Sequence, residues 1–140
     1  PLTVKEQKML RLRLGEERYH CVGRISNERL NLLYNNAFAL IYPSYYEGFG
    51  IPVLEAQKAG CPVIAYNSSS ITEIIGNTTL LLNELSVDSL KKKFELLENE
   101  EIRNEIVKAG ITNASKYTWN KMYDQVKELY QEVLHKRVLK

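Results

Sequence analysis

The sequence predicts an α/β fold in which a parallel sheet carries helices on both of its faces. Two runs of consecutive apolar residues, 38–42 and 62–65, have the composition of strands buried on both sides. Apolar residues at helical spacing occupy the stretches between and after such runs. Strands that alternate with helices are typical of parallel sheets joined by right-handed crossovers. Because 140 residues fit one domain, we expect a single Rossmann-like domain over residues 1–140.

Turn and capping residues divide the first part of the chain. Gly15 is a helix stop, Gly23 closes a short apolar run, and Ser26 can cap a helix. The expected elements are a helix at 5–14, a strand at 19–22, a helix from Ser26 to residue 36, and the strand at 38–42.

The second part is divided in the same way. Pro52 suits the first turn of a helix and Gly60 suits its end. Ser70 and Glu73 have the spacing of a capping box, which predicts a short helix. The other expected elements are strands at 62–65 and 79–82 and helices at 87–97, 100–115 and 119–136. Four strands make a small sheet and the chain starts at Pro1, so we expect one or two leading strands to precede it.

Composition and charge limit the classes of function. A net charge of +2 without a long basic run argues against a dedicated nucleic-acid binder. The sequence has no signal-peptide pattern and no apolar run of membrane-spanning length. Cys21 and Cys61 lack the spacing of a zinc site or a CxxC motif, so we expect two buried, reduced thiols in a cytoplasmic protein.

A glycine-containing loop at 43–50 is the first candidate for chemistry. It follows the strand at 38–42, and ligands of open α/β sheets bind beyond the carboxyl ends of strands. Gly48 and Gly50 allow a close approach of the backbone, and the helix start behind them favours phosphate. Since Pro52 has no N–H group, the candidate donors to a diphosphate are the backbone N–H groups of Gly50, Ile51, Val53 and Leu54.

Two carboxylates, Glu47 and Glu55, bracket this loop. The helix that carries Glu55 is mostly apolar, and a carboxylate buried there is costly unless it is hydrogen-bonded. Sugar and ribose hydroxyls are suitable donors, so we interpret both residues as holders of hydroxyls and not as metal ligands. Spacing alone leaves an alternative equally open, in which the loop is structural and Glu55 is a helix-dipole partner.

The residues themselves decide between these interpretations. Residues 43–56 read PSYYEGFGIPVLEA, and Gly60 to Ala65 read GCPVIA. This segment closely resembles the donor-site signature of family-4 retaining glycosyltransferases, whose two glutamates are separated by seven residues. Further similarity is found at 22–26, 32–34, 70–76 and 117–119, so the resemblance covers about residues 18–134.

The resemblance implies a fold and a function. Such enzymes have the GT-B fold, with two Rossmann-like domains and the active site between them, and this chain is similar to the C-terminal, donor-binding domain. The implied activity is the transfer of a hexose from a nucleotide-diphosphate sugar to a glycan or lipid-linked acceptor with retention, as in polysaccharide biosynthesis. The implied partners are the nucleotide sugar and an N-terminal acceptor-binding domain of the same protein. A cofactor and a metal are not implied, and the expected location is cytoplasmic or peripheral to the inner face of the membrane.

The resemblance also implies residue roles. Glu47 is the catalytic-site residue that holds hydroxyls of the donor sugar near the reacting carbon, and Glu55 holds the ribose. The sugar and phosphates contact Gly48, Phe49, Gly50, Ile51, Val53 and Leu54, and the nucleotide base lies near Gly23, Arg24 and Ile25.

One departure limits the activity that we expect. The family neutralises the leaving phosphates with an arginine and a lysine, whereas Lys8, Arg11 and Arg13 lie in a predicted helix away from any strand end. Because electrostatic stabilisation is usually the largest catalytic term, we expect the isolated chain to be inactive. The alternatives are a GT-B epimerase or hydrolase of nucleotide sugars and a non-catalytic binding or interaction module.

Two further interpretations concern residues outside this segment. Asn67, Ser68 and Ser69 either reach the cleft or form a turn. Trp119 is expected to pack the last helix onto the sheet.

Overall fold

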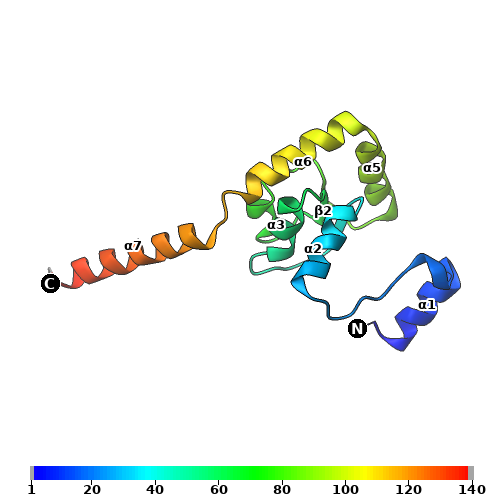
Figure 1. Ribbon diagram of the computed structural model, residues 1–140, viewed down its shortest axis with the longest axis horizontal. Helices are drawn as coiled ribbons and strands as arrows, with labels where there is room; N and C mark the ends of the chain where they lie inside the picture. Colours follow the sequence, from blue (N-terminus) through cyan, green and yellow to red (C-terminus); the bar gives the residue numbers. More distant parts are fainter. Residues whose placement is uncertain (1, 139–140) are drawn as a thin grey trace. The chain divides into compact units, whose positions relative to one another are not determined.

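The structure of the protein, a computed structural model, describes residues 2–138 (Figure 1). The chain divides into two compact units, Pro1–Leu30 and Asn31–Lys140. The first unit contains helix α1 (Val4–Leu14) and the short 3-10 helix η1 (Glu16–Arg18), and α2 (Asn27–Asn36) begins at its end.

Helix α1 starts with a capping box, because the Thr3 hydroxyl accepts from the Glu6 N–H at 3.3 Å and the Glu6 carboxylate accepts from the Thr3 N–H at 2.7 Å. The helix predicted at 5–14 is therefore confirmed. The strand predicted at 19–22 is wrong, because these residues are irregular and pair with no strand of the described chain. A strand is stable only where a neighbour takes up its N–H and C=O groups. Cys21 is exposed, in contrast to the buried thiol that we expected.

The second unit contains a parallel sheet of three strands. Strands β1 (Leu40–Tyr42), β2 (Val63–Tyr66) and β3 (Leu81–Leu82) lie in the order β1-β2-β3. Leu40 is opposite Val63, and Ala65 is opposite Leu81. The strands predicted at 38–42, 62–65 and 79–82 are thus confirmed, each with shifted or shorter bounds.

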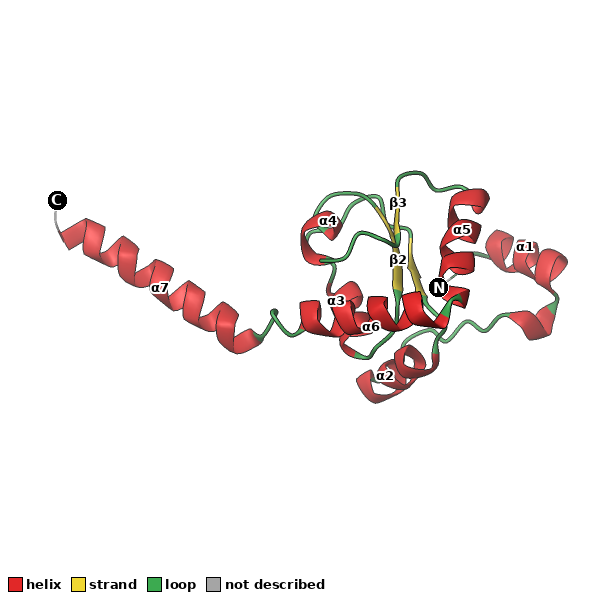
Figure 2. Ribbon diagram, turned by 90° about the horizontal axis from the view of Figure 1, so that it is seen from above, coloured by secondary structure: helices red, strands yellow, loops and turns green. Residues whose placement is uncertain are grey.

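Helices cover both faces of this sheet. On one face, Ile64 and Leu82 pack in a buried cluster with Leu97 of α5 (Val87–Glu98) and Ile106 of α6 (Glu100–Ala114). The alternate residues of β2 point the other way, towards α3 (Ile51–Lys58), which contacts both β1 and β2 and also α4 (Ile71–Ile74). Figure 2 shows the strands between α5 on one side and α3 with α4 on the other. The predicted fold class is confirmed.

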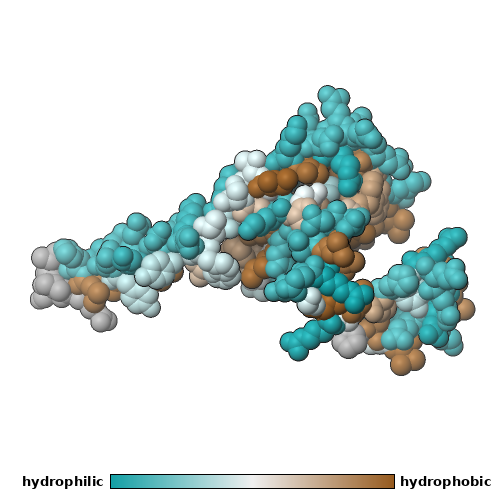
Figure 3. All heavy atoms as spheres, viewed as in Figure 1, coloured by the Kyte–Doolittle hydropathy of each residue, from teal (hydrophilic) through white to brown (hydrophobic). Residues whose placement is uncertain are grey.

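The outer surfaces of the helices differ in polarity. Figure 3 shows hydrophilic surface over the outer sides of α5 and α6. The last helix, α7 (Trp119–Val138), carries exposed apolar side chains along its length. Trp119 is 78% exposed, so the expectation that it packs onto the sheet is wrong. Within residues 2–138, no helix combines the length and the apolar character needed to cross a membrane.

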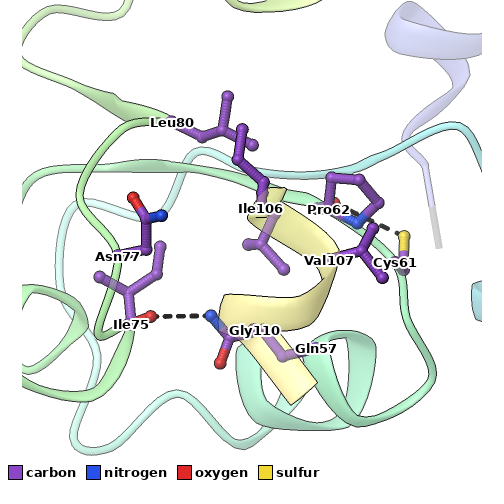
Figure 4. Close-up of a pocket in the computed structure, with 10 residues that line it drawn as sticks. Gln57, Cys61, Pro62, Ile75, Asn77, Leu80, Ile106, Val107 and Gly110 are labelled. Atoms are coloured by element: carbon purple, nitrogen blue, oxygen red, sulfur yellow. Dashed lines mark hydrogen bonds between the residues drawn. The ribbon is translucent and has the colours of Figure 1, made fainter. Parts of the chain in front are cut away.

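A buried pair of amide side chains fixes α3 to its neighbours. Gln57 of α3 donates to the Ile75 carbonyl at 2.8 Å, and Asn113 of α6 donates to the Gln57 amide oxygen at 2.9 Å and to the Ile74 carbonyl at 2.6 Å. Both side chains are 6% exposed. Figure 4 shows the Gln57 side chain beside Gly110 of α6, with its amide nitrogen pointing at the Ile75 carbonyl. A Cβ atom at Gly76 would lie 2.5 Å from the Asn113 amide, so this glycine leaves room for the pair.

We predict that Asn113→Ala destabilises the chain by about 2 kcal/mol. The substitution leaves the Gln57 oxygen and the Ile74 carbonyl buried without this donor, and an unsatisfied buried polar group costs about 1–3 kcal/mol. Urea unfolding followed by circular dichroism measures the change. The matched control is Asn104→Ala, at an exposed asparagine of the same helix. Equal losses in the two variants would contradict a specific role of the buried pair.

Candidate functional site

The candidate site lies at the edge of the sheet where the strands end. Residues 43–50, called the acidic loop below, connect β1 to α3. Residues 67–70 follow β2, the neighbouring parallel strand. Because parallel strands end at the same edge, the two segments meet at the position where α/β folds bind ligands.

Gly50 ends the acidic loop in a conformation that suits glycine. It is the N-cap of α3 with φ 96° and ψ 44°. A Cβ atom there would lie 2.7 Å from Cδ1 of Ile71 and 3.0 Å from Cδ1 of Ile74. Both isoleucines are almost fully buried. The start of α3 therefore lies directly against α4, and its position is set by this contact.

The free N–H groups at the start of α3 are fewer than the sequence indicated. The Val53 N–H donates to the Gly50 carbonyl at 3.0 Å. Leu54 is the fourth helical residue and pairs within the helix. Within the described chain, the N–H groups of Gly50 and Ile51 have no such partner, so these two remain as donors to an anion at the positive end of the helix dipole.

Glu47 lies in the acidic loop and is half-buried. Hydrogen bonds from the hydroxyls of Tyr42 and Ser44 lower the pKa of its carboxyl group. Burial, together with the hydrogen bond to Glu47, raises the pKa of Tyr42 to about 12. Glu47 is therefore ionised at neutral pH and accepts hydrogen bonds. The hydroxyls that bind its carboxylate come from the last residue of β1 and from the residue two positions later.

Glu55 lies in the second turn of α3 and is exposed. The argument that a buried carboxylate at this position needs donors is therefore wrong, although a ligand hydroxyl can still reach it. Burial raises the pKa of Tyr34 in α2, and the negative charge of Glu55 adds to this effect.

Side chains at the end of β2 and in the residues that follow it contact the acidic loop. Tyr66 makes an edge-on contact with Tyr45, with ring centroids 5.2 Å apart. Ser68 donates to the Ser44 carbonyl at 3.0 Å. Ser69 lies in a turn, which supports the turn interpretation for this residue. Ser68 and Ser69 also contact the acidic loop. Asn67 instead donates to Asn83, which follows β3, at 2.9 Å. That residues 67–69 reach a ligand cleft stays a prediction.

The capping box predicted for Ser70 and Glu73 is wrong. Ser70 makes no side-chain cap of α4, and its hydroxyl instead donates to the carbonyls of Glu47 and Phe49, at 2.9 and 3.1 Å. Tyr42, Ser44 and Ser70 are the site residues that sequence reasoning missed. Three consecutive serines after a strand end were the available signal for the last of these.

The residues predicted to lie near the base, Gly23, Arg24 and Ile25, belong to the first unit. They form an irregular stretch, in which Gly23 has φ 58°. Their proximity to the acidic loop stays a prediction. Arg11 lies in α1, as expected, and pairs with Glu16 at 3.4 Å.

The crevice drawn in Figure 4 is a different feature. It lies between α6 and the segments 61–63 and 75–80, and it contains no residue of the acidic loop. Its volume of about 10 Å³ is close to the minimum that holds one water molecule. Within residues 2–138, no three His, Cys, Asp or Glu side chains lie close enough together to hold a metal ion.

Comparisons with known proteins point to one family. The family model "Glycosyl transferases group 1" matches residues 3–114. An O-antigen chain mannosyltransferase B of Escherichia coli is 32% identical over 111 residues, which are 79% of this chain and 29% of that protein. An O-antigen chain mannosyltransferase of Salmonella typhimurium is 41% identical over 76 residues, which are 52% of this chain and 22% of that protein. A sulfoquinovosyl transferase of Arabidopsis thaliana is 34% identical over 103 residues, which are 69% of this chain and 20% of that protein.

A solved structure supports the fold. Sucrose-phosphate synthase from Thermosynechococcus elongatus superposes with a TM-score of 0.82 at 24% identity, over 94% of this chain and 34% of that one. The similarity shows an α/β fold of the GT-B kind. The family model extends over most of the chain and includes the acidic loop and all of α3, and on this ground the chain belongs to the glycosyl transferases group 1 family.

Proposed function

We propose that this chain is the C-terminal, donor-binding domain of a two-domain retaining glycosyltransferase. The protein transfers a hexose from a nucleotide-diphosphate sugar to a glycan or lipid-linked acceptor, as in polysaccharide assembly. The observation that carries the proposal is the placement of two carboxylates, Glu47 and Glu55, on either side of the free N–H groups at the start of α3. The matched segments span 29% or less of the three curated relatives named above, so the whole enzyme's activity goes beyond this chain.

The start of α3 is proposed to receive the diphosphate. The N–H groups of Gly50 and Ile51 lie at the positive end of an eight-residue helix. The positive φ of Gly50 turns the backbone sharply before the helix, which lets the loop pass close to the ligand. The donor is an anion, so these groups favour binding of its phosphates.

The two glutamates are proposed to bind different uncharged parts of the donor, Glu47 the sugar and Glu55 the ribose. Glu47 is ionised and accepts hydrogen bonds, which suits hydroxyls of the sugar next to the reacting carbon. Glu55 lies farther along α3 and is exposed, which suits the ribose hydroxyls. Several relatives carry the name mannosyltransferase, so mannose is the first sugar to test. Cys21 and Cys61 are both free thiols, which fits the cytoplasmic location included in the proposal.

We predict that Glu55→Ala weakens binding of a free nucleotide diphosphate about tenfold, while Glu47→Ala leaves it nearly unchanged. Loss of a hydrogen bond to a charged group costs about 1.5–3 kcal/mol, and about 1.4 kcal/mol is a tenfold change in affinity. Glu47→Ala should instead remove the extra affinity of the nucleotide sugar over the nucleotide. NMR titration with UDP, GDP and ADP and with their hexose derivatives measures both quantities.

The control for this experiment is Glu98→Ala, at an exposed glutamate at the end of α5. Equal losses for the free nucleotide in the Glu47 and Glu55 variants would contradict the division of roles. If millimolar nucleotide sugars shift no resonance in residues 48–55, the chain is an interaction module and not a donor-binding domain.

We further predict that the 140-residue chain alone transfers no sugar. Residues 43–57 contain no lysine or arginine, so this segment supplies no cation for the leaving diphosphate. A radiolabelled donor-to-acceptor assay with the chain, and with the same chain joined to an acceptor-binding domain, measures the difference. A sustained transfer rate from the isolated chain would refute the prediction.

A further inference from the structure

The backbone of the acidic loop is held by hydroxyl groups from a second loop. Ser69 accepts from the Glu47 N–H at 3.0 Å and donates to the Glu47 carbonyl at 3.3 Å. Ser70 donates to the same carbonyl at 2.9 Å and to the Phe49 carbonyl at 3.1 Å. Because a hydroxyl has one proton, Ser70 shares or alternates between these two acceptors. Both polar groups of the Glu47 backbone are thus satisfied by residues 22 and 23 positions away.

Ser69 has a backbone conformation that a non-glycine residue rarely adopts. Its φ of 43° makes it the one non-glycine residue with positive φ in the described chain. Such conformations persist where surrounding interactions hold them, and they concentrate at functional sites. The turn directs the Ser69 hydroxyl at the Glu47 backbone. The two hydrogen bonds between these residues help to hold Ser69 in its strained conformation.

The two serines are attached to a rigid part of the fold. The next residue, Ile71, is fully buried, and Ile74 is 4% exposed. These same isoleucines contact Gly50 at the end of the acidic loop. Asn113 holds the Ile74 carbonyl in the core. Residues 69–70 are therefore a fixed support next to a loop that is otherwise exposed.

We propose that Ser69 and Ser70 are positioning residues for Glu47, which fix the backbone of the acidic loop so that the carboxylate points at the donor sugar. The proposal rests on the role given to Glu47 under the proposed function. The Glu47 carboxylate is held separately by the hydroxyls of Tyr42 and Ser44 from β1 and the residues that follow it. The hydrogen bonds from Ser69 and Ser70 to the Glu47 backbone restrict the directions in which the carboxylate can point.

The two serines should affect binding of the sugar and not binding of the nucleotide. Glu47 is assigned to the sugar, whereas the nucleotide contacts α3, which Gly50 and the buried amide pair hold in place independently of the two serines. Loss of the serine hydroxyls should therefore reduce the part of the affinity that comes from the sugar. The affinity for the nucleotide alone should change little.

The test measures backbone order in the ligand-free 140-residue chain by ¹⁵N relaxation. The variants are Ser69→Ala, Ser70→Ala and the double variant. We expect the order parameters of Glu47 and Gly48 to fall from about 0.85, typical of a rigid backbone, towards 0.6 or below. Unchanged order parameters at these two residues in the double variant would overturn the proposal, whatever the binding results.

Three control variants separate the hydroxyls from other effects. Ser69→Gly removes the hydroxyl and the strain together, so it should loosen Glu47 as Ser69→Ala does. Ser70→Thr keeps a hydroxyl and should restore the order. Ser115→Ala removes an exposed serine whose hydroxyl donates to the nearby Thr112 carbonyl at 2.8 Å, and it should leave the acidic loop unchanged. A Ser70→Thr variant as mobile as Ser70→Ala would count against the proposal.

A second measurement tests the link to the donor. Titration with GDP and with GDP-mannose gives the ratio of the two affinities for each variant. We expect the ratio in favour of GDP-mannose to fall about three- to tenfold in the double variant, because a hydrogen bond contributes about 0.5–1.5 kcal/mol. If the original chain binds neither compound while the loop still loosens in the variants, the serines hold Glu47 and the proposed function fails. If the loop loosens and the ratio stays constant, the positioning role is overturned.

Discussion

The contact between Gly50 and the two isoleucines of α4 is the constraint on which the site depends. No side chain larger than hydrogen fits between the start of α3 and Cδ1 of Ile71, only 2.7 Å from where a Cβ would lie. The contact brings two segments together that are separated by a whole strand in the sequence. It places the first free N–H groups of α3, and it also places the serines that precede Ile71 against the acidic loop. A larger residue at position 50 would disturb both at once.

The fold was more predictable than the contacts of the site. The apolar runs at 38–42 and 62–65 predicted two strands because buried parallel strands have few polar residues, and both are present. The run at 19–22 has a similar composition but no pairing partner in the described chain, and pairing is a tertiary property that a local pattern does not contain. Trp119 shows the same limit, because the helix was predictable while the exposed surroundings of its first residue were not.

The sequence predicted the site residues that form a local motif. It did not predict the site residues whose contacts are far away in the sequence. Glu47, Gly50 and Glu55 lie within nine positions and form one motif. Ser70 was assigned to a capping box with Glu73, a local pattern that the serine satisfies in the sequence. In the structure its hydroxyl bonds carbonyls 21 and 23 positions away, because the segments that follow the parallel strands β1 and β2 lie at the same edge of the sheet. Local and distant partners compete for one hydroxyl, and only the folded chain decides between them.

The charge balance of the site requires groups from elsewhere. Residues 43–57 carry two carboxylates and no lysine or arginine. The start of a helix contributes about half a positive charge, which is less than the charge of a diphosphate. With Glu47 kept ionised by Tyr42 and Ser44, the donor therefore meets a segment with net negative charge. Neutral hydroxyl donors on the sugar and ribose reduce this repulsion at the carboxylates, but not at the phosphates. Cations from outside residues 43–57 must therefore neutralise the charge of the phosphates. The presence of these cations then determines whether the donor is bound tightly enough to react.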